Sequence, residues 1–176
     1  GYEPLDFSGL NWSDRHLTEL FMYDLGVATI PDNIGDLDSL SMLYLFENEI
    51  DSIPESIGDL SNLTLLDFGR NNISHTPETV WGLDNLTILN FQENQLTSIS
   101  ENVCQIHPNL TYEPFLTNNS ICPPYPECLI EANIGYQDTY YCEECSDLIG
   151  DVNNDSSLSI LDVIITINCI LSDTCS

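Results

Sequence analysis

The chain has 176 residues, of which 29 are acidic and two, Arg15 and Arg70, are basic, so its formal net charge is −27 at pH 7. This acid excess excludes binding to nucleic acid or to an anionic membrane, because both need a basic surface. Neighbouring copies repel one another unless salt, divalent cations or an apolar contact offsets the charge.

The dominant pattern is a 23-residue period that begins at Leu17 and recurs at Leu40, Leu63 and Leu86. Periods of this length are typical of solenoids, in which each unit buries its apolar side only by stacking on its neighbours. Apolar residues alternate after each leading leucine, which predicts a short strand with one face turned inward. The predicted inward sets are Leu17/Leu20/Met22, Leu40/Leu43/Leu45, Leu63/Leu66/Phe68 and Leu86/Leu89/Phe91.

Polar and proline positions recur with the same period. An asparagine eight residues after the leading leucine is predicted to satisfy backbone groups in the turn that leaves the strand. Prolines that follow it are predicted to break the chain into a turn on the convex side. These residues are Asn48, Asn71 and Asn94, and Pro31, Pro54 and Pro77.

Each unit therefore approximates LxxLxLxxNxIxxIPxxIGxLxx. This pattern resembles the leucine-rich repeat family, in the IPxxIGxL subtype of plant and bacterial extracellular proteins, over about residues 10–121. The resemblance implies an α/β solenoid with a short parallel β-sheet on its concave face. The predicted domains are an N-terminal capping segment (1–16), the repeats (17–121), a cysteine-rich cap (122–149) and a calcium loop with a helix (150–176).

The outward positions of the predicted strands carry an unusual number of apolar side chains. A sheet that faces solvent is normally polar there, and a contiguous apolar, aromatic patch marks an interface. The alternative is that Trp12 and the segment 2–10 fold over the patch, and a register error of one residue would exchange the two faces. The predicted partner-binding residues are Phe21, Tyr23, Met42, Tyr44, Phe46, Leu65 and Ile88.

Sequons of the form N-x-S/T are dense along the chain. Three of them occupy the same place in successive repeats, one residue before the leading leucine, which predicts a column of glycans along one edge. The alternative is that asparagine at this joint is a normal feature of such repeats and that the following threonine suits a strand. The predicted glycosylation sites are Asn11, Asn62, Asn72, Asn85, Asn109, Asn118 and Asn154.

Cys104 lies near the end of the fourth 23-residue unit and the other six cysteines follow it, a clustering that favours an oxidising, extracellular compartment over a zinc site built on Cys142 and Cys145. The odd number leaves one thiol free or bonded to another molecule. The stretch from Cys122 to Cys128 resembles the cysteine-bearing caps of secreted bacterial leucine-rich repeat proteins. Among the open pairings, the preferred disulfides are Cys104–Cys122 and Cys128–Cys142, with Cys145 bonded to Cys169 or Cys175.

The tail has the spacing of a calcium-binding loop. Short oxygen ligands at positions 1, 3, 5, 7, 9 and 12 suit Ca²⁺, with a backbone carbonyl at position 7. The segment resembles one half of a type I dockerin, although Ser156 replaces the usual glycine and no second repeat follows. The predicted Ca²⁺ ligands are Asp151, Asn153, Asp155, Ser157, Ser159 and Asp162, followed by an apolar helix over 160–171.

These features predict a secreted, extracellular protein with a processed N-terminus and no enzymatic activity, because the three histidines are scattered and no nucleophile has a local base. No apolar stretch is long enough to insert into a membrane. Two functions remain open. One is a glycosylated, calcium-binding structural or adhesive protein that associates with other copies of itself, including into filaments. The other is a recognition module that binds a foreign protein or glycan and is tethered to a scaffold by its tail.

Overall fold

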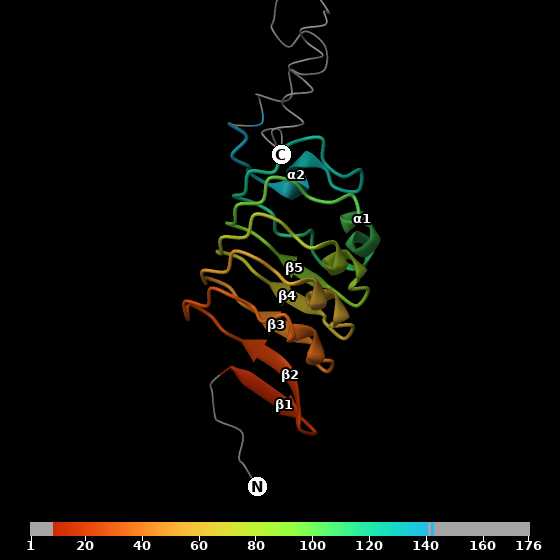
Figure 1. Cartoon of the computed structure of the whole chain (residues 1–176). Coiled ribbons are helices and arrows are strands. Elements are labelled where there is room, and N and C mark those ends of the chain that lie inside the picture. Colours follow the sequence, from red (N-terminus) through yellow and green to blue (C-terminus); the bar gives the residue numbers. More distant parts are fainter. Residues whose placement is uncertain (1–8, 141, 143–176) are drawn as a thin grey trace, which may run out of the picture.

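The computed structural model describes residues 9–140 and residue 142, which form a coil of stacked repeats closed by a cap (Figure 1). Four short parallel strands pair in sequence order, and an antiparallel strand precedes them at the N-terminal edge. The strands are β1 (Leu10–Ser13), β2 (His16–Phe21), β3 (Met42–Tyr44), β4 (Leu65–Asp67) and β5 (Ile88–Asn90). Each residue of a parallel strand pairs with the residue at the same position of the next repeat, for example Met42 with Leu65 and Leu65 with Ile88.

The side of the solenoid opposite the sheet is made of single turns of helix. Pro54 and Pro77 are the N-cap residues of η2 (Glu55–Asp59) and η3 (Glu78–Gly82), so the predicted convex turns are confirmed. The helical segments are η1 (Ile34–Asp36), η2 (Glu55–Asp59), η3 (Glu78–Gly82), α1 (Val103–Ile106), η4 (His107–Asn109) and α2 (Glu131–Ile134). Within residues 9–140 and 142, no helix is long and apolar enough to cross a membrane.

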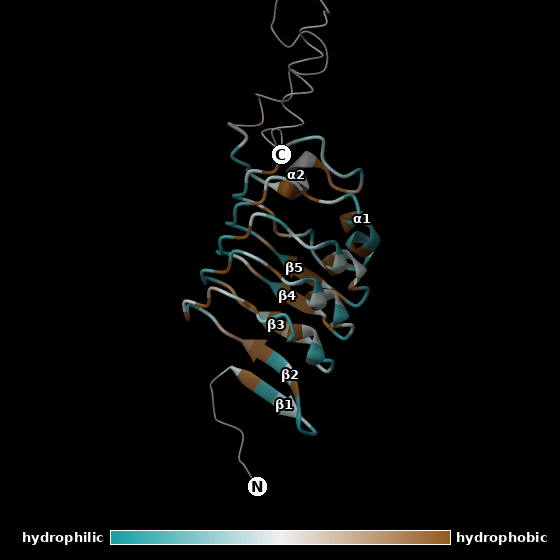
Figure 2. Cartoon of the chain, viewed as in Figure 1, coloured by the Kyte–Doolittle hydropathy of each residue, from teal (hydrophilic) through white to brown (hydrophobic). Residues whose placement is uncertain are grey.

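The core fills the space between sheet and convex turns, as the alternation predicted. Leu43 and Leu66 have no exposed surface, and Leu89 is 1% exposed. Phe68 stacks on Phe91 with ring centroids 5.8 Å apart. Brown, hydrophobic segments accordingly alternate with polar ones along each coil in Figure 2. The inward assignment of the leading positions is confirmed, which fixes the opposite positions on the concave face.

The N-terminal edge is closed by the β1–β2 hairpin. The amide of Phe21 donates to the carbonyl of Gly9 at 2.7 Å. A Cβ on Gly9 would lie 2.3 Å from the Phe21 carbonyl oxygen, and the φ of Gly9 is +126°, so only glycine fits this close approach. Trp12 stays 48% exposed on β1. The segment 2–10 is the alternative cover for the concave apolar patch, and its residues 2–8 lie outside the described residues.

A ladder of side-chain amides holds successive coils together. Asn71 accepts from the Ile50 amide at 3.0 Å, and its Nδ2 donates to the carbonyls of Leu45 and Phe68 at 2.9 Å. Asn48 and Asn94 make equivalent bonds, which confirms the predicted role of this position. Asn119 bonds in the same way, and Gln137 continues the ladder beyond residue 121, the predicted end of the repeats.

The two described disulfides correct the predicted pairing. Cys104 is bonded to Cys128 and Cys122 to Cys142, each with a Cα–Cα distance of 5.5 Å. The pairings Cys104–Cys122 and Cys128–Cys142 are therefore wrong. The physical reason is an additional coil, shown by the amide ladder, that the sequence pattern did not predict. Because each coil has about this length, cysteines separated by 24 and by 20 residues lie side by side on adjacent coils. Cys145, Cys169 and Cys175 lie outside the described residues.

A candidate binding face on the concave sheet

The predicted partner-binding residues lie together on the concave face. The register aligns Met42, Leu65 and Ile88 in one column and Phe21 with Tyr44 in the next. Tyr23 is 52% exposed, and the other six residues are half-buried. Half-burial on the sheet face means that each side chain leans on its neighbours while keeping one side toward solvent. The structure thus forms the contiguous apolar surface that the alternation predicted.

Four rings form the centre of this surface, and we call Phe21, Tyr23, Tyr44 and Phe46 the aromatic cradle. The ring centroids are 6.0 Å apart for Phe21 and Tyr44, 6.0 Å for Tyr44 and Phe46, and 5.9 Å for Tyr23 and Phe46. Aromatic pairs at such distances stabilise one another by about 0.5–1.5 kcal/mol beyond simple burial. The four rings are therefore already ordered before a partner binds, so binding costs this protein little side-chain entropy.

Gly69 makes room for the cradle on the next coil. It occupies the column position of Tyr23 and Phe46, and a Cβ added there would lie 2.7 Å from the Phe46 ring and 2.8 Å from Nδ2 of Asn90. Any side chain at position 69 would displace one of these two groups. The absence of a side chain lets Phe46 lie over the neighbouring coil, and this inclination was not predictable from the alternation.

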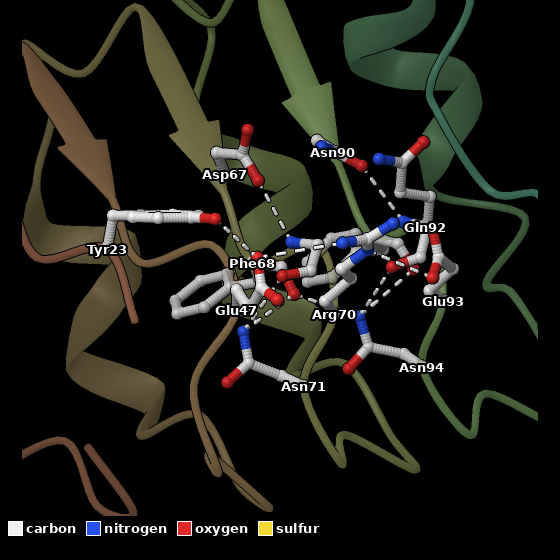
Figure 3. Close-up of polar contacts among 12 residues, drawn as sticks. Tyr23, Glu47, Asp67, Phe68, Arg70, Asn71, Asn90, Gln92, Glu93 and Asn94 are labelled. Atoms are coloured by element: carbon white, nitrogen blue, oxygen red, sulfur yellow. Dashed lines mark hydrogen bonds and ion pairs between the residues drawn. The ribbon is translucent and has the colours of Figure 1, made fainter. Parts of the chain in front are cut away.

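Arg70 closes one end of the cradle and was missed by the sequence analysis. Its guanidinium carbon lies 5.4 Å from the centroid of Phe46, a cation–π distance. Its Nε donates to Glu93 at 3.0 Å, and its NH1 lies 3.6 Å from Glu47 (Figure 3). Tyr23 donates its hydroxyl to the same Glu47 at 2.7 Å. The available signal was that arginine, rare in this chain, replaces the glutamate found at this place in the flanking repeats.

Both titrating ends of this network have shifted pKa values. The hydrogen bond and charge of Glu93 raise the pKa of Arg70, and the hydrogen bond to Glu47 raises the pKa of Tyr23. The guanidinium therefore stays charged and the phenol stays protonated across the physiological range. Asp24, Glu47, Arg70, Glu93 and Asn118 all have a positive φ, between 50° and 59°. This repeated conformation aligns their side chains along one rim of the concave face.

Asp67 is a buried carboxylate on the concave face. It is 8% exposed, and it accepts a hydrogen bond from the amide of Gly69 at 2.9 Å. Burial raises the pKa of Asp67, while the Gly69 amide and the Asn90 side chain oppose that shift. Burial, followed by the charge of Asp67, raises the pKa of Tyr44, the residue opposite Asp67 in the register. Among the described residues, no arginine or histidine nitrogen lies within 4 Å of this carboxylate.

The sequon column is present as a physical feature of one edge. Nδ2 of Asn62, Asn85 and Asn109 donates to a carbonyl of the preceding coil, at 2.8, 2.8 and 3.0 Å. All three side chains are exposed, as are those of Asn11, Asn72 and Asn118. Each amide keeps a second hydrogen, so the ladder bond is compatible with a glycan on the same nitrogen. Asn154 lies outside the described residues.

The predicted calcium ligands, over 151–162, also lie outside the described residues. In the described part of the chain, no three His, Cys, Asp or Glu side chains gather in a way that could hold a metal ion. The concave face continues past β5, where Asn90 forms a parallel bridge with Phe115, a 43% exposed residue. Phe115 therefore extends the column of Phe21 and Tyr44. The 23-residue period did not predict this position, because Phe115 follows Asn90 by 25 residues.

Residues 38–96 match the family model described as leucine rich repeat. The fold is that of a leucine-rich repeat protein. No curated protein matches this chain in sequence. Among solved structures, a leucine-rich repeat protein of Leptospira interrogans is 35% identical, with a TM-score of 0.51, over 55% of this chain and 24% of that one.

Two leucine-rich repeat ectodomains of Arabidopsis thaliana receptor kinases are also similar. The ectodomain of SOBIR1 is 26% identical, with a TM-score of 0.56, over 61% of this chain and 60% of that one. The ectodomain of GASSHO1/SCHENGEN3, solved in complex with CASPARIAN STRIP INTEGRITY FACTOR 2, is 28% identical, with a TM-score of 0.53, over 62% of this chain and 13% of that one. This chain spans less than two thirds of each of the three structures.

Proposed function

We propose that this leucine-rich repeat protein is an extracellular, non-enzymatic binding module that holds a protein partner on its concave face. The observation that carries the proposal is the aromatic cradle, a preordered apolar surface on a sheet face that is normally polar. Disulfides in the cap suit an oxidising compartment. The similar GASSHO1/SCHENGEN3 ectodomain, solved in complex with an integrity factor, supports a binding role.

The cradle is expected to contribute most of the binding energy. Exchanging Tyr44 and Phe46 together for serine should weaken binding at least about 30-fold, because a single central aromatic anchor already contributes about 2 kcal/mol or more. Peptides selected from a displayed random library on the wild-type protein serve as probes, with affinity measured by fluorescence anisotropy. Ile130→Ser, which removes a 62% exposed apolar side chain from the cap, is the matched control. Selected peptides that bind the cradle variant as tightly as the wild type would contradict the proposal.

Self-association is the second candidate, and the odd number of cysteines favours it because one thiol is left for an intermolecular bond. In this form the partner is another copy, and a contact that does not close produces filaments. Sedimentation velocity in millimolar calcium and in EDTA tests it. A single monomeric species under both conditions would exclude self-association.

Calcium binding at the tail loop is part of the proposal. Calcium should raise the melting temperature by about 5 °C, since a ligand that binds only the folded state stabilises it by mass action. Exchanging Asp151 and Asp155 together for alanine should abolish this shift, because both are predicted ligands. The measurement is differential scanning calorimetry with and without EDTA. An equal calcium shift in the variant and the wild type would show that the loop is not the site.

N-glycosylation along one edge is also proposed. Expression in a eukaryotic secretory host should give a protein whose mass falls on treatment with an N-glycosidase. Exchanging Asn62, Asn85 and Asn109 together for glutamine should remove three glycans, as measured by intact mass spectrometry. A wild-type mass that the glycosidase leaves unchanged would rule the sequon column out as a modification site.

A further inference from the structure

The charge around the cradle narrows the chemistry of its partner. Five carboxylates lie on the concave strands or on the rim beside them, whereas Arg70, the basic group of this site, is already paired. The carboxylates are those of Glu19, Asp24, Glu47, Asp67 and Glu93. Resting on the proposed function, we propose that the concave face binds a basic, extended segment of a foreign protein, with Asp67 as the counter-ion of a lysine or arginine and the cradle as its apolar wall.

Asp67 has the geometry that such a cation needs. Its carboxylate is 8% exposed, and the described donors to it are neutral groups, the Gly69 amide and the Asn90 side chain. A carboxylate offers about four lone-pair directions, so two bonds leave acceptor capacity. Tyr44, directly opposite in the register, supplies a ring face for a cation that approaches the carboxylate. The partly desolvated setting strengthens a charge pair relative to one in open water.

The negative charge of Asp67 is not required by the fold. The equivalent residue of the next coil is Asn90, whose side-chain oxygen accepts from the amide of Gln92 at 2.9 Å, just as Asp67 accepts from Gly69 at 2.9 Å. A neutral asparagine therefore makes the same turn bond at the same position. Because a buried carboxylate is less favourable than a neutral amide, its presence at position 67 is explained by a partner's charge better than by folding.

A second copy of the chain is a poor source of the lysine or arginine that would pair with Asp67. The sequence has no lysine and two arginines, of which Arg70 is held by Glu47 and Glu93. Two copies at −27 each repel one another at long range, whereas a basic segment is attracted and steered to the concave face. Arg15, in the turn of the β1–β2 hairpin, is the other arginine that a second copy could supply.

The test uses short synthetic peptides in which leucine alternates with arginine, with citrulline (its neutral analogue) or with glutamate. Fluorescence anisotropy on the full chain should show binding of the arginine peptide, at least about tenfold weaker binding of the citrulline peptide and none of the glutamate peptide. Asp67→Asn should weaken the arginine peptide about tenfold and keep the melting temperature. Glu55→Gln, which removes one exposed charge on the convex turn η2, should change binding less than about twofold.

Three outcomes would overturn the inference. If Asp67→Asn and Glu55→Gln weaken binding of the arginine peptide equally, the net charge of the protein explains the effect and Asp67 is not the counter-ion. Equal affinity of the arginine and citrulline peptides would leave binding to apolar segments, and with it the proposed function, intact while removing the charged counter-ion. Dimers in sedimentation that Arg15→Ser and Asp67→Asn both dissociate, with no binding of the arginine peptide, would assign the site to a second copy. If the peptides selected from the library bind the Tyr44/Phe46 variant as tightly as the wild type, the proposed function fails as well.

Discussion

Asn71→Ala is expected to lower the free energy of unfolding by about 3–5 kcal/mol, because each buried polar group left without a partner costs about 1–3 kcal/mol. The side chain connects two coils. Its oxygen accepts from Ile50, and its nitrogen donates to the carbonyls of Leu45, Phe68 and Gly69 at 2.9, 2.9 and 3.2 Å. Alanine leaves the buried amide of Ile50 without an acceptor and opens a cavity at a residue that is 7% exposed.

The neighbouring residue provides the control. Asn72 has the same chemistry but is exposed, and its described side-chain bond is a 3.3 Å contact from Gln95. Asn72→Ala should therefore change stability by less than about 0.5 kcal/mol. Urea unfolding followed by circular dichroism measures both variants. Equal stabilities for the Asn71 and Asn72 variants would show that the amide ladder does not hold the coils together.

The part of the concave face that the sequence predicted follows from strand alternation. Leu43, Leu66 and Leu89 must point inward, since a slip of one residue would turn Glu19 and Asp67 into the apolar core between the sheet and the convex turns instead. The same constraint directs Tyr44 and Phe46 outward. It fixes only the direction of a side chain from its strand. The stacking of Phe46 over Gly69 and the reach of Arg70 between two glutamates depend on contacts across coils, which a period does not encode.

The end of the solenoid was harder to predict because its spacing changes. Asn119 follows Asn94 by 25 residues instead of 23, and in the next coil Gln137 replaces asparagine altogether. The local pattern nevertheless survives, since Leu116, Asn119 and Ile121 stand in the same relation as Phe91, Asn94 and Leu96. Because a count of 23 skips this coil, the cysteines are assigned to an irregular cap, and the disulfide partners on adjacent coils cannot be read from the period.

The corrected disulfides give a second large effect. Exchanging Cys104 and Cys128 together for alanine is expected to lower the free energy of unfolding by about 3 kcal/mol, the loop-closure contribution of a disulfide that spans a loop of this size. The bond joins α1 to the coil beyond it, at the end of the core where Val103 and Ile106 are fully buried. Losing it loosens the last described coils, which lie at one end of the described stack.

The same experiment separates the observed pairing from the one that the sequence analysis preferred. With Cys104 bonded to Cys128 and Cys122 to Cys142, the exchange of Cys104 and Cys122 breaks both bonds, whereas the exchange of Cys104 and Cys128 breaks one. The Cys104/Cys122 variant should therefore be less stable than the Cys104/Cys128 variant by roughly another 3 kcal/mol. With the pairing Cys104–Cys122, the order of the two variants is reversed. Urea midpoints give the order, and non-reducing peptide mapping of the wild type identifies the bonds directly.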